Sequence, residues 1–245
     1  MSTTMDVMDK LHIEEGFDRN GLAKALESAG YPASDGNVRY MLSKLMNNGS
    51  VIRVGRNSYQ KSGKKRSYQY KHSNEALGVA NEILAEHPFL DFRVFELIQL
   101  NEFVNHQIAH NTIFVSVESG VEDFVFSSLW EKHTGNVMLK PKEDEFFRYY
   151  TDDKIVVGKL VSESPKGASE FWDTRIEKML VDVLADKLLS KMISEGEYDN
   201  IFRDAVRKYA IDVNTLKRYA RRRGALNRIA EVLDENDICL EGINK

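Results

Sequence analysis

The stretch that decides the fold of the N-terminal part is Ser34–Lys61, SDGNVRYMLSKLMNNGSVIRVGRNSYQK. Starting at Val38, its apolar side chains recur at i, i+4, i+7 and i+8, the spacing of one face of a helix. This spacing predicts a helix over residues 34–48. After Gly49, the runs VIRVG and SYQ flank an Arg-Asn turn, which predicts a short β-hairpin.

A second helix is expected just upstream, over residues 21–29, because Asp18 or Asn20 can cap it and Gly30 can end it. Helix, turn, helix and hairpin in this order form a winged helix-turn-helix. In that arrangement the second helix enters the major groove and the hairpin reaches phosphates. We therefore expect residues 1–72 to be a winged helix-turn-helix DNA-binding domain that ends in a basic arm.

Charge is segregated along the chain in a way that supports this expectation. Residues 1–72 hold 12 Lys/Arg and 7 Asp/Glu, whereas residues 73–245 hold 22 and 31. A small basic head on an acidic body is typical of a domain that binds a polyanion. The residues expected to contact duplex DNA are Asn37, Arg39, Tyr40, Lys44, Asn47, Arg53, Arg56, Lys61, Lys64, Lys65 and Arg66.

One alternative remains open for the role of this domain, and one for the position of Tyr40. A winged helix can also serve protein contacts alone, although the nine cations against one acid between Ser34 and Lys71 favour DNA. Tyr40 fits a position half inside the core as well as a contact to base or phosphate.

Composition limits the other functional classes. The longest apolar runs are far shorter than the ~20 residues of a membrane helix, and the acidic N-terminus does not resemble a secretory signal. A single cysteine, Cys239, fits a reducing compartment and offers no zinc site. We expect a cytoplasmic protein with no membrane partner, no metal and no cofactor.

Residues 73–245 are expected to form a second domain of α+β (mixed α/β) class, a small mixed sheet followed by a helical bundle. Strands are expected at 93–99, 112–117, 136–139 and 154–161. Helices are expected at 72–86, 101–107, 119–132, 175–193, 198–209, 213–222 and 225–233.

Catalytic chemistry has one candidate in this body. Glu118, Glu122, Asp123 and the Asp152-Asp153-Lys154 cluster can be assembled into a metal-dependent nuclease site. Against this, Glu122 fits a capping box with Ser119, and Asp152-Asp153 lies where a turn belongs. Because no phosphate-binding glycine loop or nucleophile elbow is found either, we expect the protein not to be an enzyme.

A cationic helix near the C-terminus is the last feature, IDVNTLKRYARRRG over residues 211–224. Asp212 can cap it, and Leu216 with Ala220 makes its buried stripe, so that its cations are expected on the other faces. A solvated helix end, a second nucleic-acid contact and a partner surface all fit such charges. We assign partner contacts to Lys217, Arg218, Arg221, Arg222 and Arg223.

Three passages of the chain resemble the antitoxin of AbiE-type abortive-infection systems, which are type IV toxin–antitoxin systems. The first passage is VRYMLSKL at 38–45, with the hairpin residues up to Tyr59. The second is RIEKMLVD at 175–182, similar to the EKLLVD run of the family. The third is LKRYARRRG at 216–224, similar to its LxxYAxRRG ending.

The resemblance implies an autoregulated transcriptional repressor whose N-terminal domain binds inverted repeats at its own promoter. We expect cooperative binding on DNA, which is compatible with a monomer in solution. It also implies that the C-terminal antitoxin domain opposes a nucleotidyltransferase toxin in phage defence, without needing a stable complex. The long basic arm between wing and body departs from the common form of the family. The alternative hypothesis is a winged helix that delivers a nuclease-like body to DNA.

Overall fold

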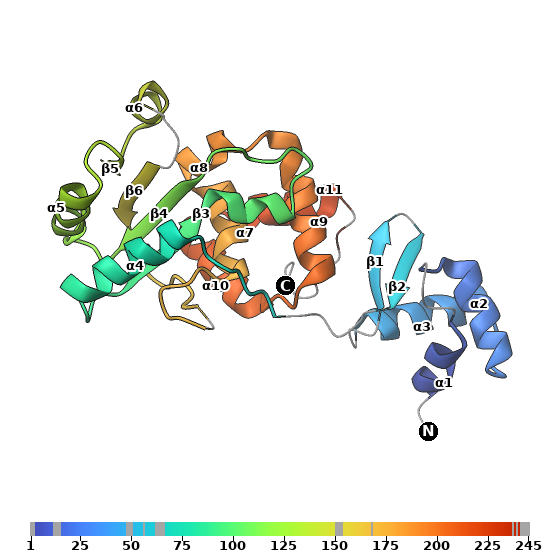
Figure 1. Cartoon of the computed structure of the whole chain (residues 1–245). Helices are drawn as coiled ribbons and strands as arrows, with labels where there is room; N and C mark the ends of the chain where they lie inside the picture. The colour runs from blue at the N-terminus through green and yellow to red at the C-terminus, as the bar shows by residue number, and fades with distance from the viewer. Residues whose placement is uncertain are drawn as a thin grey trace.

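The computed structural model describes residues 3–11, 16–47, 51–55, 57–61, 67–149, 154–167, 169–236, 238 and 240. Figure 1 shows two groups of elements, a small N-terminal group and a larger body. Their hydrophobic side chains fall into separate buried clusters, one for the N-terminal group and three for the body.

The N-terminal group consists of α1 (Thr3–Lys10), α2 (Arg19–Ser28), α3 (Asp35–Asn47), β1 (Val51–Gly55) and β2 (Ser58–Lys61). These elements confirm the helix–helix–hairpin order expected from the sequence. Asp18 caps α2 by accepting a hydrogen bond from the backbone N–H of Gly21 at 2.8 Å. β1 and β2 are antiparallel, and Asn57 in their turn has a positive φ of 54°.

Helix α1 was not expected from the sequence. It contributes Val7 and Met8 to the core, and Leu11 follows directly after it. These side chains pack with Leu22 of α2 and Leu45 of α3, all of them buried. A helix this short has a weak periodic signal of its own, and its burial against α2 gives it stability.

The body is built on a mixed sheet of four strands, β3 (Phe92–Glu96), β4 (Thr112–Val117), β5 (Val137–Leu139) and β6 (Lys154–Lys159). Their order across the sheet is β3-β4-β6-β5. β3 is antiparallel to β4, whereas β4, β6 and β5 are parallel to one another. The expected small mixed sheet is therefore confirmed.

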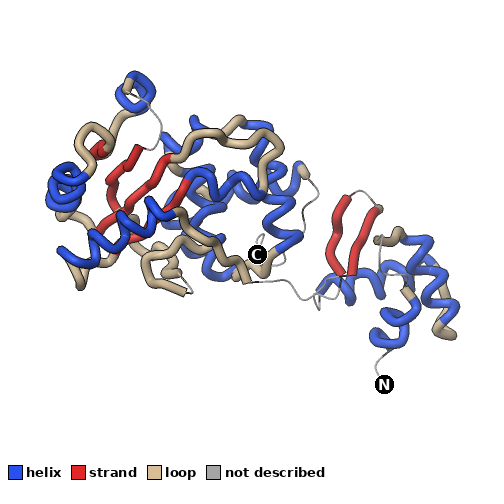
Figure 2. The backbone as a smooth tube through the Cα atoms, viewed as in Figure 1, coloured by secondary structure: helices blue, strands red, loops and turns tan. Residues whose placement is uncertain are grey.

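Helices cover both faces of this sheet (Figures 1 and 2). One face packs on α4 and α5, and the other on the C-terminal bundle. The helical elements of the body are α4 (Asn74–Glu86), η1 (Leu97–Glu102), α5 (Glu122–Lys132), α6 (Glu143–Arg148), α7 (Ile176–Ala185), α8 (Lys187–Met192), η2 (Glu195–Glu197), α9 (Tyr198–Lys208), α10 (Val213–Arg223) and α11 (Leu226–Glu235). No helix among the described residues is long and apolar enough to span a membrane.

Two sequence expectations for the region after β3 are wrong. The strand expected at 93–99 ends at Glu96, because the chain then turns into the 3₁₀ helix η1. The helix expected at 101–107 is absent, and η1 ends at Glu102. The side chain of Gln99 accepts from the backbone N–H of Glu96, which closes a tight turn where the apolar pattern alone suggested a longer strand.

The expected helix boundaries also need two corrections. Ser119 does not cap α5: the helix begins after Val121, and the carboxylate of Glu122 accepts from the backbone N–H of Gly120. The single helix expected over 175–193 is broken at Asp186, whose backbone is extended. Its carboxylate caps α8 by accepting from the N–H groups of Leu188 and Leu189.

Candidate functional site

Helix α3 has one buried and one exposed face. Val38, Met41, Leu42 and Leu45 point into the N-terminal core and are at most 5% exposed. The predicted contact residues Asn37, Arg39, Tyr40 and Lys44 are all exposed on the other side. Tyr40 is 66% exposed, so it is not part of the core.

The exposed residues of α3 differ in whether their side chains already contact other residues of the protein. Asn37 donates its side-chain N–H to the carbonyl of Pro32 at 3.0 Å, and Arg39 forms an ion pair with Asp35 one turn earlier. The hydrogen bond and charge of Arg39 lower the pKa of Asp35. For Tyr40 and Lys44 no such partner is found among the described residues, which makes them the freest contact candidates on α3.

The remaining predicted contacts fall outside what the structure describes. Arg56, Lys64, Lys65 and Arg66 are not among the described residues, and for Asn47, Arg53 and Lys61 the side chains are not. Their roles stay predictions from the sequence.

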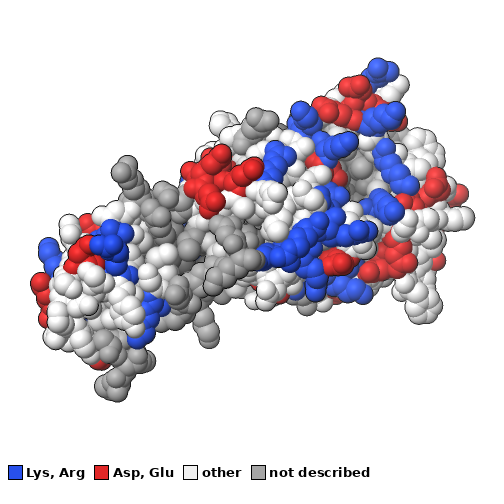
Figure 3. Space-filling view, turned by 180° about the vertical axis from the view of Figure 1, so that it is seen from behind, with Lys and Arg blue, Asp and Glu red and all other residues white. Residues whose placement is uncertain are grey.

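Helix α10 carries the five cations that are expected to contact a partner, and the structure divides them into two groups. Arg218, Arg221 and Arg222 are exposed. Lys217 is only 9% exposed, which corrects the expectation that it projects into solvent. Arg223 is turned inward, with its side chain 17% exposed. Figure 3 shows Lys and Arg side chains gathered in a band across this side of the body.

Arg223 is held by two acids at the C-terminal end of α7. Its Nε lies 3.1 Å from Asp182 and its Nη2 lies 3.6 Å from Asp186. The Nε is close enough for an ion pair but is not aligned for a hydrogen bond. Asp182 also accepts from the hydroxyl of Tyr219 at 3.0 Å and pairs with Lys178 one turn before it. Burial and the Asp182 charge raise the pKa of Tyr219.

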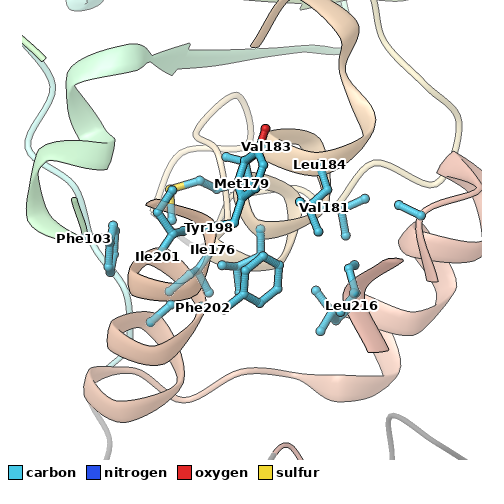
Figure 4. Packing of buried hydrophobic residues seen from close by; sticks show 14 of the residues in the cluster. Phe103, Ile176, Met179, Val181, Val183, Leu184, Tyr198, Ile201, Phe202 and Leu216 are labelled. Carbon is cyan, nitrogen blue, oxygen red and sulfur yellow. The ribbon is translucent and has the colours of Figure 1, made fainter. Parts of the chain in front are cut away.

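Further contacts hold α7 and α10 together along their length. Glu177 accepts from the backbone N–H of Asp212 at 2.8 Å, immediately before α10 begins. Leu216 of α10 lies in the same hydrophobic cluster as Val181 and Leu184 of α7 (Figure 4). Apolar and ionic contacts together therefore fix the direction in which the end of α10 points.

A cleft of about 780 Å³ lies at this end of α10, where β4 and β6 reach their carboxyl ends. We term it the strand-end cleft. It is lined by Asp91, Glu118, Ser119, residues 159–164, Arg222 and Arg223. Arg222 donates from its Nε to the hydroxyl of Ser162 across the cleft wall at 2.5 Å. A second hollow of about 430 Å³ adjoins it and shares Lys159 and Arg223.

The comparisons with known proteins can be placed on this geometry. Residues 37–238 match a protein family described as a family of unknown function, DUF6577. The chain belongs to the DUF6577 family. The match begins within α3 and includes the hairpin and the whole described body as far as residue 238, but not α1 or α2.

A search of curated proteins finds no match. The crystal structure of the RV2827C protein from Mycobacterium tuberculosis aligns over 97% of this chain and 83% of its own, with 10% identity and a TM-score of 0.25. Similarity at that level supports no argument about fold or function.

Two of the acids proposed for a nuclease site, Glu118 and Glu122, have structural partners in the DUF6577 body. Glu118 accepts from the backbone N–H of Asp91, and Glu122 pairs with Lys140 at 3.0 Å besides binding Gly120. The hydrogen bonds and Lys140 lower the pKa of Glu122.

The other acids of the nuclease hypothesis add no support for a metal site. Asp152 and Asp153 lie outside the described residues, and Asp123 is exposed on the first turn of α5. Within the described part of the chain, no three metal-ligating side chains converge.

Sequence reasoning singled out Glu118, Arg222 and Arg223 but missed Arg93 and Lys159, which complete the strand-end cleft and its wall. Arg93 is 1% exposed and donates to the carbonyls of Pro165 and Ser164, which fixes the loop after β6 against β3. An arginine inside the apolar run FRVF was the only signal for this contact. Lys159 lay within an expected strand, and only the tertiary fold brings it to Arg222.

Proposed function

We propose that this DUF6577 protein is a DNA-binding antitoxin of the AbiE type. In this proposal, residues 1–72 form a winged helix that binds operator inverted repeats and represses the protein's own operon. Residues 73–245 oppose a nucleotidyltransferase toxin. The observation that carries the proposal is α3, which buries its apolar face in a core of its own and leaves a polar, cationic face exposed beside a hairpin.

The exposed face of α3 supports the DNA-binding half. A helix of this length fits the major groove, and an exposed tyrosine and lysine without partners in the described structure suit contacts to bases and phosphates. Because the N-terminal 72 residues carry five more cations than acids, the domain attracts a polyanion over some distance.

The end of α10 supports the antitoxin half. Arg218, Arg221 and Arg222 concentrate exposed positive charge at one place on a body that holds nine more acids than cations. Such a place suits an acidic protein surface or bound phosphates. A nucleotidyltransferase gene beside this gene would support the assignment.

The test of the DNA-binding half uses the full chain and a fluorescent duplex from the protein's own promoter. If about five cations neutralise phosphates, the logarithm of the association constant should fall against the logarithm of salt concentration with a slope of about −4 to −5. Binding that does not depend on salt, or no binding at low salt, contradicts the proposal. Metal-dependent cleavage of the duplex would favour the nuclease alternative instead.

A pair of lysine variants places the contact on α3. Lys44→Ala should weaken binding and reduce the salt slope by about one unit. Lys24→Ala removes the same charge from the exposed side of α2 and serves as the control. Equal losses in the two variants would mean that net charge matters and that α3 is not the element in the groove.

A further inference from the structure

The strand-end cleft has the position of a ligand site in the sheet. β4 and β6 are adjacent and parallel, and their chains leave the sheet toward opposite faces. After β4 the chain enters α5, which packs on one face. After β6 it runs through 160–175 to α7, which packs on the other. Small ligands of open α/β sheets bind in the crevice that forms where neighbouring strands diverge in this way.

The cleft is also bounded and held in shape. Its volume of about 780 Å³ lies within the usual range for small-molecule sites, roughly 300–1,000 Å³. The loop that forms its outer wall is fastened by the buried guanidinium of Arg93, at 3.0 Å from the carbonyl of Pro165. Its opposite wall ends in Arg223, which Asp182 holds at 3.1 Å. The walls are therefore set before any ligand binds.

Charge is distributed unevenly within the cleft. Strand pairing places Asp91 and Glu118 on the β3–β4 side and Lys159 on the β6 side, where Arg222 and Arg223 join it. The acid on the β6–α10 side, Glu163, lies 3.6 Å from Arg218. The Oδ1 of Asp91 pairs with Arg93 at 2.7 Å. Lys159 is exposed and forms no ion pair within the described residues. The β6–α10 side suits an anion, whereas carboxylates on the β3–β4 side suit hydroxyl and amino donors.

We propose that the strand-end cleft binds a ribonucleotide, with its phosphates against Lys159 and Arg222 and its sugar and base toward Asp91 and Glu118. A nucleotide is anionic at one end and rich in hydrogen-bond donors at the other, which matches this division of charge. A nucleic-acid strand is anionic along its whole length, and its phosphates would meet the carboxylates on the β3–β4 side. The site lies in the body and is independent of operator binding.

The experiment titrates the full-length protein calorimetrically with ATP, GTP, CTP and UTP, and separately with pyrophosphate and with the four nucleosides. At least one triphosphate should bind more tightly than both pyrophosphate and its own nucleoside. No binding of any triphosphate overturns the inference. Equal binding of pyrophosphate would reduce the site to an anion site, and tighter binding of single-stranded RNA would assign it to nucleic acid; either result overturns it too.

Variants locate the binding in the cleft. Lys159→Ala and Arg222→Ala should each weaken triphosphate binding by about tenfold or more, as expected for a lost hydrogen bond to a charged group. Arg221→Ala is the matched control, because Arg221 is exposed on the same helix turn but does not line the cleft. It should change the affinity less than about twofold. An equal loss with Arg221→Ala would show that binding follows net charge and not the cleft.

The carboxylate side has its own test. Glu118→Gln keeps the oxygen that accepts from Asp91 but removes the charge. It should weaken nucleotide binding and leave pyrophosphate binding unchanged or stronger. A parallel change for both ligands contradicts the proposed orientation. Circular dichroism shows whether each variant is folded. Operator binding is assigned to the N-terminal domain and is measured separately. Failure of the nucleotide proposal is therefore distinct from failure of the DNA-binding proposal.

Discussion

His72 shows how a single residue fastens the segment before α4 to the sheet. Its Nδ1 lies 3.1 Å from Glu96 of β3 and its Nε2 lies 2.9 Å from Asp173, with the ring 6% exposed. Burial lowers the pKa of His72, but the hydrogen bonds to Asp173 and Glu96 outweigh it and raise the pKa to about 9. The imidazolium therefore donates from both nitrogens at neutral pH.

The raised pKa predicts a pH dependence of stability. Since the folded pKa lies above the unfolded value, the stabilisation is complete below about pH 6.5 and is lost as the pH rises through about 9. The difference in free energy of unfolding between wild type and His72→Gln should shrink by up to about 3 kcal/mol between pH 6 and 9.5. Urea unfolding followed by tryptophan fluorescence measures it, because Trp130 and Trp172 both lie in the body.

A control for this measurement is His106→Gln. The side chain of His106 is 93% exposed although it pairs with Glu197, so its loss should cost less than about 1 kcal/mol. A difference between wild type and His72→Gln that is constant across this pH range would show that the histidine acts through packing against Trp172 and not through its charge.

At the scale of elements, the pair α7 and α10 explains why two sequence motifs occur together. Lys178 and Asp182 come from the RIEKMLVD passage, while Tyr219 and Arg223 come from LKRYARRRG. In the fold these four side chains meet in one network around the carboxylate of Asp182. Part of these two passages therefore has a structural role. Of the exposed arginines of α10, Arg222 bonds to Ser162 and Arg218 lies 3.6 Å from Glu163.

This network predicts a large cost for Asp182→Ala. The substitution leaves Lys178 mostly buried without its acid and leaves Arg223 with the more distant Asp186 only, so the free energy of unfolding should fall by about 3–5 kcal/mol. Tyr219→Phe removes one hydroxyl and should cost about 1 kcal/mol.

Asp204→Ala is the matched control, because it breaks an i,i+4 pair with Lys208 that is more than one-third exposed. It should cost about 0.5 kcal/mol or less. Similar losses for Asp182→Ala and Asp204→Ala in urea unfolding would contradict the network.

The elements also show what a sequence can reveal. The pattern in α3, β4 and α10 lies within each element, so periodicity found their bounds nearly to the residue. The break at Asp186 and the turn of η1 depend on side chains that cap the backbone locally. The strand-end cleft joins residues far apart in the sequence, such as Arg222 and Ser162, which are 60 positions apart, and no spacing in the sequence encodes that approach.

At the scale of the whole molecule, the two proposed activities lie on different parts of the chain. The exposed face of α3 belongs to a group of elements with its own core, and α10 belongs to the body. Variants on one surface should therefore leave the other activity intact. Lys217 and Arg223 do not suit such a test, since one is buried and the other holds α7.

The separation of activities is tested with a double charge reversal, Arg221→Glu with Arg222→Glu. Both side chains are exposed, so the fold should lose only about 0.3–1 kcal/mol for each reversed charge near the helix end. The variant should fail to rescue cells that express the neighbouring nucleotidyltransferase, because it replaces positive charge with negative at the proposed contact, while operator binding stays intact. Arg203→Glu with Arg207→Glu makes the same change on the exposed side of α9 and should still rescue.

Each result of this experiment distinguishes one role of the α10 arginines from another. Full rescue by a folded Arg221/Arg222 variant would reduce them to a solvated helix end, whose charge serves the helix dipole alone. Loss of operator binding together with rescue would make them a second DNA contact. Loss of rescue in the α9 control as well would mean that the acidic body must keep its overall charge balance and that no particular surface meets the toxin. Loss of rescue confined to the α10 variant, with operator binding retained, supports a role of this end of the body in antitoxicity. Because Arg222 also lines the strand-end cleft, Arg221→Glu alone separates the two surfaces: loss of rescue by this single variant supports an antitoxin contact outside the cleft.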